Sequence, residues 1–502
     1  MQKSKLIKNS IAAIIQVIIV GIVYLILYKY LLDTIGIKLL GVWSLIIATT
    51  SLALIANFGI STSIIKFVST YHARQDFESL KKLVFTSSIF ILVTYLFIAA
   101  IILFLGDYFL HYFIETAYIK IALEILPYSL ICLIINALGG VVSGSLDGIQ
   151  KNNLKSNIVS FSAVLLLGLS LLLTPKYGLK GLVFAQIVQA LLVLIFTTYY
   201  LSKNIPGIFS FRWNWSRVIF KEIINYGLKM QALSFMQMSF EPVTKVFISK
   251  FGGLAMVGYY EMASRLVSQL RSLIVSANQV VIPVVAEAKE NNNDFVKELY
   301  YKSFSIILFL NTGLTTLIIL SAPFVSKIWI GEIVPVFIFS VILNSIAGFI
   351  NISSNPAYFS YLGEGKLNWL IYSYVVITIT NIVFGYYFGY YFGGFGVIVA
   401  WNLAFILGSL LIISTYHKSL KINLFKIVSG NQFLLILLSV LLCLSGCYSA
   451  VCFMNNSNNY VVLGLFLILL FLFFVLFIKN KNFLFLLKEI KRLLSNNKKF
   501  GI

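Results

Sequence analysis

Charged residues are scarce in this chain, and acidic residues are scarcer still. Only 11% of its 502 residues are charged, with 17 Asp and Glu against 38 Lys and Arg. Together with a mean hydropathy of +0.95, this composition excludes a soluble globular domain and is typical of a polytopic membrane protein. The basic excess does not indicate nucleic-acid binding, because the basic residues gather in short loops and at the chain ends, as topology signals do.

Cysteine and histidine are too few and too scattered to form a metal centre. The cysteines are Cys132, Cys443, Cys447 and Cys452. Spacings of four and five residues on one helix fit neither a CxxC pair nor a usual zinc pattern, so we interpret the cysteines as structural. The three histidines form no HExxH motif, and we expect no metal or other cofactor.

Signatures of catalysis are also missing. The sequence has no GxxxxGK[ST] phosphate loop, which excludes ATP hydrolysis by this chain, and no GxSxG nucleophile elbow. The segments between apolar runs on the inner side are too short to form a soluble catalytic domain. The sequence therefore favours a transporter over an enzyme, and a membrane-bound polymerase or ligase is the weaker alternative.

Long apolar runs fill most of the chain instead. A run of about 20 apolar residues is long enough to cross the hydrocarbon core as a helix. Fourteen such runs occur, at 11–31, 40–66, 83–105, 119–145, 154–174, 178–201, 224–249, 254–284, 303–323, 333–353, 368–388, 392–416, 430–452 and 459–478. We therefore predict an all-α polytopic membrane protein with about 14 transmembrane helices. The first run is too long for a signal peptide and has no cleavage site, so we expect it to be a retained span.

The basic residues orient these spans. With the N-terminus inside, 26 Lys and Arg fall in inner segments and only 7 in outer segments. Cytoplasmic loops of membrane proteins carry such an excess of Lys and Arg. An odd number of spans would invert half of the loops and remove the bias, so the sequence predicts that both ends of the chain are cytoplasmic.

An internal repeat divides the chain. One constant offset aligns Ser145 with Ser360, Gly148 with Gly363, Lys151 with Lys366, Asn153 with Asn368, Gly178 with Gly393, Gly181 with Gly396 and Ala185 with Ala400. Six spans separate the copies, so both have the same orientation, as in transporters with parallel repeats. We predict an N-terminal six-helix lobe at 1–203, a C-terminal six-helix lobe at 204–420, and two additional helices with a basic tail at 421–502.

Three basic residues lie where a membrane protein tolerates charge least. Lys245 falls in the span at 224–249, and Arg265 and Arg271 fall in the span at 254–284. A cation near the bilayer centre costs roughly 2.5–3.5 kcal/mol even on insertion scales. Such residues therefore normally face a partner or a water-filled cavity.

Acids and amides accompany these bases at helical spacing. The sets that share a helix face are Gln237, Glu241 and Lys245 in the first span, and Glu261, Arg265 and Gln269 in the second. Two interpretations stay open. Buried ion pairs, such as the one that Glu241 and Lys245 can form at a spacing of four residues, could simply hold the two spans together. Alternatively, because two acids accompany three bases, a hydrated cationic cavity could receive an anionic headgroup such as a diphosphate, for which Arg supplies paired donors.

Glu124 is an acid within a span that has no obvious basic partner nearby in the sequence. It lies near the predicted outer end of the span at 119–145. We consider it a candidate ion-coupling residue, although an interfacial carboxylate is the simpler interpretation.

Several segments resemble the bacterial polysaccharide (O-antigen-type) repeat-unit flippases of the multidrug/oligosaccharidyl-lipid/polysaccharide superfamily. GVWSLIIATTSLALIANFGISTSIIKFVS (41–69) resembles their second span and the loop that follows it, and GSLDGIQKNNLKSNIVS (144–160) resembles their loop between spans 4 and 5. The segment at 225–271 resembles their seventh and eighth spans, and the likeness covers most of 5–420 in layout. One departure is Asn57, where the family pattern suggests Asp before Phe-Gly-Ile.

The resemblance implies a flippase of the bacterial cytoplasmic membrane. It implies outward transfer of undecaprenyl-diphosphate-linked oligosaccharide repeat units by alternating access, for surface polysaccharide synthesis that also involves a polymerase and chain-length machinery. It further implies a central cationic cavity and a groove for the polyprenyl tail beside spans 13 and 14. The predicted substrate-binding residues are Arg265, Arg271, Lys245, Lys229, Lys66, Glu241, Glu261, Gln237 and Gln269, with Lys66 and Lys229 making the first capture. A lipid II flippase and a cation-coupled multidrug exporter of the same superfamily are the alternatives.

Overall fold

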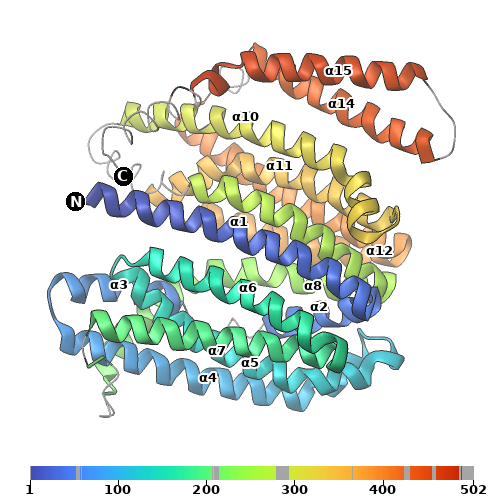
Figure 1. The fold of residues 1–502 in the computed structure, drawn as a ribbon. Coiled ribbons are helices and arrows are strands. Elements are labelled where there is room, and N and C mark those ends of the chain that lie inside the picture. Colours follow the sequence, from blue (N-terminus) through green and yellow to red (C-terminus); the bar gives the residue numbers. More distant parts are fainter. Residues whose placement is uncertain are drawn as a thin grey trace. The chain divides into compact units, whose positions relative to one another are not determined.

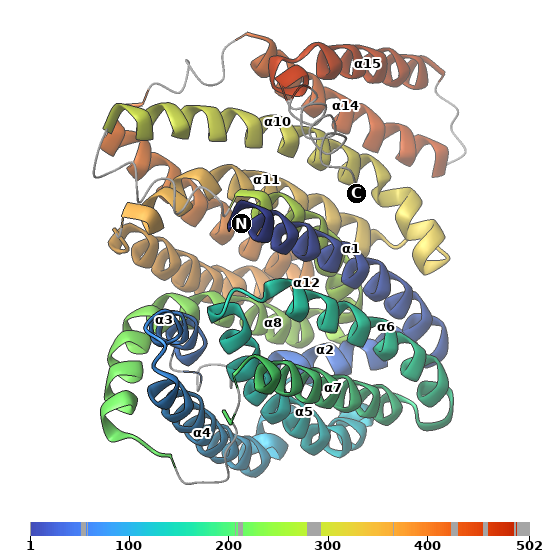
Figure 2. The ribbon, with the colours of Figure 1, turned by 60° about the vertical axis from the view of Figure 1, so that its left-hand side comes forward.

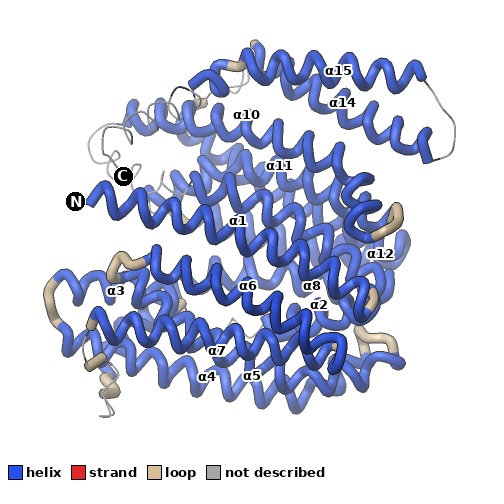
Figure 3. Tube along the Cα trace, viewed as in Figure 1, coloured by secondary structure: helices blue, strands red, loops and turns tan. Residues whose placement is uncertain are grey.

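The described part of the chain is helical throughout, apart from the turns that join the helices (Figure 3). A computed structural model describes residues 2–51, 57, 59–205, 207–208, 214–278, 293–364, 366–422, 430–454, 460–485 and 488. The all-α fold class predicted from the apolar runs is therefore confirmed.

The helices follow the predicted apolar runs along the chain (Figure 1). Their bounds are α1 Gln2–Ile35, α2 Ile37–Ser51, α3 Ile60–Ala73, α4 Phe77–His111, α5 Thr116–Gly148, α6 Asn152–Tyr177, α7 Leu179–Asn204, α8 Arg217–Asn278, α10 Asn293–Val325, the π-helical turn η2 Ser326–Ile330, α11 Pro335–Glu364, α12 Asn368–Leu420, α14 Asn431–Met454 and α15 Tyr460–Lys479. Among the described residues, 8 helices are long and apolar enough to cross a membrane. This shows a multi-pass membrane protein, while the count of fourteen and the orientation stay predictions.

Two of the long helices each contain a pair of predicted spans. The helix α8 carries non-helical backbone angles at Gly253, and α12 carries them at Gly393. Both glycines lie at or next to the predicted junction of two spans. The span predicted at 40–66 behaves differently, because α3 begins after Gly59 in the left-handed conformation, so this run does not form one continuous helix.

The chain divides into two compact units. The first comprises residues 1–262 and 374–404, and the second comprises 263–373 and 405–502. The chain therefore passes from one unit to the other within α8 and again within α12. The lobe boundaries predicted from the repeat, at 203 and 420, stay a prediction.

In the first unit, α3, α4 and α5 pack around a continuous apolar core, and α7 packs on α5 and α6 (Figures 1 and 2). Ile64, Leu83 and Leu146 are fully enclosed in that core. Burial of each such side chain stabilises the fold by about 1.5–3 kcal/mol relative to exposure in water. In a membrane this driving force is weaker, so close packing between helices matters more.

In the second unit, α10 packs against both α11 and α14, and α15 lies beside α14 as a hairpin (Figure 1). Amide groups fix the C-terminal helices on α10. Gln432 Nε2 donates to the Ser305 carbonyl at 2.7 Å, and Asn482 Nδ2 donates to the same oxygen at 3.2 Å. The Phe477 ring stacks on Phe309 with centroids 4.4 Å apart. These contacts attach the helices that lie outside the predicted repeat.

The backbone supports the predicted repeat at positions that the alignment pairs. Gly178 has φ 57° and ψ −138°, and its counterpart Gly393 has φ 63° and ψ −156°. A Cβ on Gly181 would overlap the Leu173 carbonyl, and a Cβ on Gly396 would overlap the carbonyl of Phe388, the residue aligned with Leu173. In the preceding loops, the same backbone bond closes the turn, from Lys151 N to Leu146 O at 2.9 Å and from Lys366 N to Tyr361 O at 3.0 Å.

We expect Gly396→Ala to destabilise the protein by about 1–3 kcal/mol, because the added methyl group would force apart the segments of α12 before and after Gly393. The measurement is the midpoint of thermal unfolding in detergent. Gly168→Ala is the matched control, since a Cβ at this helical glycine meets nothing within 4 Å. It should change stability by no more than about 1 kcal/mol, in the stabilising direction. Equal losses in both variants would contradict the close approach at Gly396.

Candidate substrate-binding site

Lys245 is a buried cation enclosed by two carboxylates. Its side chain is 3% exposed, and its Nζ lies 2.6 Å from Glu241 Oε1 and 2.6 Å from Glu261 Oε2. Glu241 is four residues earlier on α8, and its side chain is 59% exposed. Glu261 follows the break at Gly253, and its side chain is 7% exposed. The predicted pairing of Glu241 with Lys245 is confirmed, and Glu261 is a second partner.

Glu261 is the centre of this cluster. Besides Lys245, it accepts a hydrogen bond from Tyr28 Oη on α1 at 2.5 Å and one from Ser44 Oγ on α2 at 3.0 Å. Both donors are buried. A buried carboxylate is strongly disfavoured unless it is paired and hydrogen-bonded, and these three donors meet that requirement. Glu261 thereby joins α1, α2 and the two arms of α8, which are the segments before and after Gly253.

The charge balance of this cluster differs from the positive excess that the sequence suggests. Two acids surround one base, so the group of Lys245, Glu241 and Glu261 carries a formal charge of −1. The interpretation of buried ion pairs that hold helices together describes this geometry better than a direct anion site does. Lys245 is a member of the first compact unit, whereas Arg265 and Arg271 belong to the second.

Arg271 lies in a polar and aromatic setting within the second unit. Its Nη2 donates to Asn351 Oδ1 on α11, and its guanidinium lies 5.3 Å from the centroid of the Phe405 ring on α12. Asn351 Nδ2 in turn donates to Ser409 Oγ at 2.9 Å. The Arg271 side chain is half-buried. The planar fork of N–H donors on a guanidinium matches the oxygens of a phosphate, and here an amide and an aromatic face orient it.

The remaining predicted bases and amides have varied positions. Arg265 and Gln269 are half-buried on α8, one turn and more beyond Glu261. Lys66 is exposed on α3, with its Nζ 5.4 Å from the Phe67 ring centroid. Lys229 and Gln237 lie on α8, but their side chains are outside the described residues.

Glu124 has a basic partner that the sequence did not reveal. Its Oε2 lies 3.0 Å from Lys180 Nζ, and both side chains are about two-fifths exposed. Lys180 lies on α7, which packs against α5, so the pair joins neighbouring helices at their ends. Lys180 is distant from Glu124 in the sequence, so the pair follows from helix packing, and the ion-coupling role of Glu124 stays a prediction. Such an exposed pair is worth little in stability.

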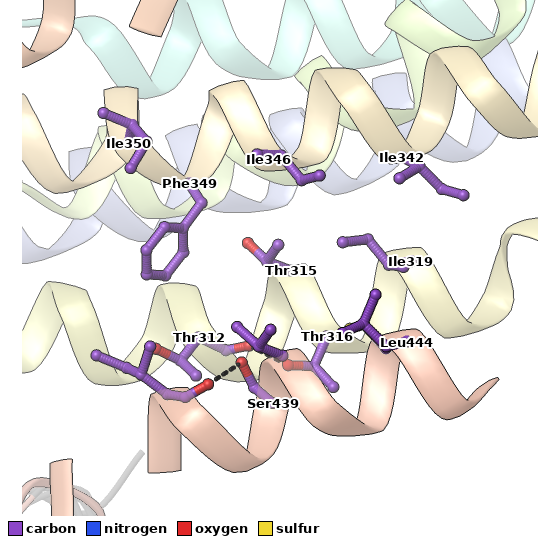
Figure 4. A pocket seen from close by; sticks show the side chains of 13 residues that line it. Thr312, Thr315, Thr316, Ile319, Ile342, Ile346, Phe349, Ile350, Ser439 and Leu444 are labelled. Atoms are coloured by element: carbon purple, nitrogen blue, oxygen red, sulfur yellow. Dashed lines mark hydrogen bonds between the residues drawn. The ribbon is translucent and has the colours of Figure 1, made fainter. Parts of the chain in front are cut away.

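An apolar cavity of about 250 Å³ lies between α10, α11 and α14 (Figure 4). Its walls are mostly aliphatic, with Phe349 and Ile350 at one end and Leu444 at the other. All the helices that form it belong to the second unit. A cavity with such walls accommodates hydrocarbon rather than a sugar or a phosphate.

The hydroxyl groups in this cavity do not make it polar. Each of them donates within its own helix, namely Thr312 to Leu308 O, Thr315 to Asn311 Oδ1, Thr316 to Thr312 O, and Ser439 to Ile436 O, at 2.7–3.3 Å. Hydroxyls engaged in this way present their carbon atoms to the cavity, which leaves its lining apolar.

A family model places the chain among known proteins. The model for polysaccharide biosynthesis proteins matches residues 36–333, more than half of the sequence. The chain belongs to the polysaccharide biosynthesis protein family. The matched region includes α2 and both arms of α8, and hence the whole Lys245–Glu261 cluster except Tyr28. It also includes Arg271 but not its partners Asn351 and Phe405.

Relatives and solved structures agree with this family. The chain is 21% identical to a candidate O-antigen transporter of Shigella flexneri over 427 residues, which cover 82% of this chain and 98% of that protein. The lipid II flippase MurJ in an inward closed conformation is similar with a TM-score of 0.70 at 16% identity, covering 94% and 99% of the two chains. An inward-facing multidrug resistance transporter of the MATE family has a TM-score of 0.68 at 17% identity, covering 80% and 94%. These likenesses show a shared transporter fold.

Several important side chains were missed by sequence reasoning. Tyr28 and Ser44 are single polar residues within apolar runs, and each lies more than 200 positions before Glu261. Asn351 likewise gives no signal of its contact with Arg271. The paired glycines at 36 and 41, and at 253 and 258, could have aligned α2 with the second arm of α8.

We expect Lys245→Met to destabilise the protein by about 3–5 kcal/mol, because Glu261 would lose the cation that compensates its buried charge. Lys180→Met is the control, since it removes a cation from an exposed pair, and it should cost no more than about 1 kcal/mol. Thermal unfolding of both purified variants gives the comparison. A Lys245 variant as stable as the Lys180 variant would show that the buried pair contributes nothing.

Replacement of Glu124 tests its role as an ion-coupling residue. Because Glu124 forms an exposed pair with Lys180, Glu124→Gln should keep the export of surface polymer within about twofold of wild type. Polymer at the cell surface is the readout. A loss of export in folded Glu124→Gln protein would support Glu124 as an ion-coupling residue.

Proposed function

We propose that this protein is a flippase of the bacterial cytoplasmic membrane that moves undecaprenyl-diphosphate-linked oligosaccharide repeat units to the outer leaflet. Membership of the polysaccharide biosynthesis family is the observation that carries the proposal. Similarity to a candidate O-antigen transporter over almost its full length, and a fold shared with transporters, support it. Alternating access in a protein with parallel repeats would provide the movement. A polysaccharide polymerase with its chain-length machinery would then use the transferred units.

Arg271 is our candidate for binding the diphosphate. It is a guanidinium deep in the predicted eighth span, and the neutral side chains of Asn351 and Phe405 orient it. A planar guanidinium can bind phosphate oxygens in pairs, which a lysine cannot do. Arg265 and Gln269, on the same helix, are the proposed additional ligands, and Lys66 and Lys229 are proposed to attract the headgroup first. Lys245 has its charge compensated by Glu241 and Glu261, so we assign it a supporting role in the state described.

The apolar cavity is our candidate for holding part of the polyprenyl chain. Its walls come from α10, α11 and α14, the last being the first of the two predicted helices outside the repeat. A hydrocarbon chain gains contact with the aliphatic walls, and the engaged hydroxyls leave no polar group of these side chains unsatisfied. The position beside Arg271's partner helix α11 would allow one lipid to use both features of the second unit.

A lipid II flippase is the closest alternative, because its substrate carries the same kind of lipid diphosphate and the MurJ fold is similar. The anion site and the apolar cavity would serve either lipid. A multidrug exporter of the MATE type fits less well, since a cationic drug would be repelled by an oriented guanidinium.

Removal of the proposed anion ligand should stop export. In a strain that lacks its own polysaccharide flippase, the wild-type chain should restore surface polymer, and Arg271→Ala should reduce it at least tenfold because the diphosphate loses paired donors. Arg217→Ala, at an exposed arginine at the start of α8, is the matched control and should restore export. Protein amounts in the membrane are measured for each. Full export with Arg271→Ala would refute this site while leaving the transporter assignment intact.

Filling the apolar cavity tests the proposed tail site. Ser439→Phe places a ring in the cavity and should reduce export severalfold by excluding the hydrocarbon chain. Ser439→Ala, which keeps the cavity open and removes only a bond to Ile436, should export like wild type. Surface polymer and membrane protein amounts are compared for both variants. Normal export with the cavity filled would exclude it as a binding site.

A further inference from the structure

A second alignment within the chain relates α2 to the second arm of α8. Gly36 and Gly253 both have φ 80°, and each is followed five positions later by another glycine, Gly41 or Gly258. The offset between these pairs is slightly longer than in the repeat described above. It aligns the predicted second span with the eighth, and therefore links the same two repeat copies.

The aligned glycines contact one another's helices reciprocally. A Cβ on Gly41 would overlap the Leu254 carbonyl, and a Cβ on Gly258 would lie 2.6 Å from the Ile37 carbonyl. Ile37 and Leu254 are themselves equivalent, since each directly follows the first glycine of its pair. A contact in which each partner uses the equivalent residues is the signature of a local two-fold axis. The axis therefore passes between α2 and α8 in the first compact unit.

The Glu261 cluster lies on the same axis. Ser44 and Glu261 are equivalent in this second alignment and hydrogen-bond to each other at 3.0 Å. Tyr28 and Lys245 are likewise equivalent, and both donate to Glu261, at 2.5 and 2.6 Å. Four helix segments that the repeat relates in pairs thus converge on one carboxylate. Only the second copy supplies the ionised groups of this cluster, because Tyr and Ser replace Lys and Glu in the first.

In transporters built from parallel repeats, the substrate path runs along the interface between the copies. Direct contact between equivalent residues leaves no room for a substrate at that level. The predicted topology puts the N-terminal ends of spans 2 and 8, and therefore this contact, towards the outer face. The described state is accordingly closed on that side.

We infer that Glu261 holds an outer gate closed on the repeat axis. Its bonds to Tyr28 and Ser44 must break in every transport cycle. The role of this gate in a transport cycle rests on the proposed function. The contacts that form the gate do not depend on that function. The two donors come from the first repeat copy, whereas Lys245 and Glu261 come from the second. Separation of the copies therefore removes two bonds and leaves the Lys245–Glu261 pair intact.

This asymmetry explains how a gate can hold a buried charge and still open. Lys245 compensates Glu261 in both states, so opening does not leave an isolated carboxylate at membrane depth. The two released donors are neutral and can be hydrated in an open path. Close backbone approach at Gly41 and Gly258 supplies the rest of the seal.

Accessibility of a cysteine behind the gate tests the inference. Ala48 is buried on α2, four residues beyond Ser44 on the same helix face. Ala48→Cys is made in a chain whose four natural cysteines are replaced by alanine, and a membrane-impermeant maleimide is added to intact cells. Glu261→Gln should speed labelling by about tenfold or more, because loss of charge-assisted bonds favours the open state.

Glu241→Gln is the matched control. The variant removes the same charge as Glu261→Gln, and Glu241 is likewise a partner of Lys245. The Glu241 carboxylate is exposed, however, and is bonded to neither Ser44 nor Tyr28 in the described contacts. Labelling in this variant should stay within about twofold of the parent. Equal labelling rates in the Glu261 and Glu241 variants would overturn the proposal. The readout needs no transport, so a failed complementation experiment would leave it unaffected.

A double variant that keeps the charge pair guards against a Glu261→Gln chain that fails to fold. Tyr28→Phe combined with Ser44→Ala removes both donors of the first copy and leaves Lys245 beside Glu261. Ala48→Cys should be labelled about threefold faster or more in this variant than in the parent, because the closed state loses two hydrogen bonds. Unchanged labelling in the folded double variant would overturn the proposal.

Discussion

A buried carboxylate that must be compensated determines much of the architecture around it. In the described state α1, α2 and both arms of α8 converge on Glu261, which is bonded to Tyr28, Ser44 and Lys245. The glycines at 41 and 258 permit that convergence, because they let the helix backbones approach without side chains between them. In a membrane, where apolar burial between helices contributes little, such polar and close-packed contacts specify which helices meet.

Lys245 and Arg271 lie in neighbouring predicted spans but have different surroundings in the folded chain. Lys245 lies between two carboxylates, which compensate its charge. Arg271 donates to the amide of Asn351 and lies against the ring of Phe405. Of these two basic residues, only Arg271 is proposed to bind the anion directly. The apolar cavity in the second unit is the proposed site for the lipid portion of the substrate.

Sequence patterns predicted the helices well because membrane spans are defined by length and hydropathy alone. The repeat was also visible, and Gly178 and Gly393 adopt matching backbone conformations as the alignment requires. The pairing of Glu241 with Lys245 followed from helical spacing. Contacts of Glu261 and the pair of Glu124 with Lys180 were not predictable, since they depend on how separate helices pack. The sequence offset that aligns Gly36 with Gly253 is slightly longer than the offset that aligns Gly178 with Gly393. A single constant offset therefore did not align Ser44 with Glu261.

Transport in proteoliposomes tests most directly our proposal that this chain carries lipid-diphosphate-linked oligosaccharides across a membrane. A fluorescent undecaprenyl-diphosphate oligosaccharide and fluorescent lipid II are placed in separate vesicles, and an impermeant quencher reports their movement between leaflets. We predict that the purified protein accelerates movement of the oligosaccharide lipid over protein-free vesicles, and does so more than for lipid II. No acceleration of either lipid would contradict the account, and acceleration of lipid II alone would identify the alternative substrate.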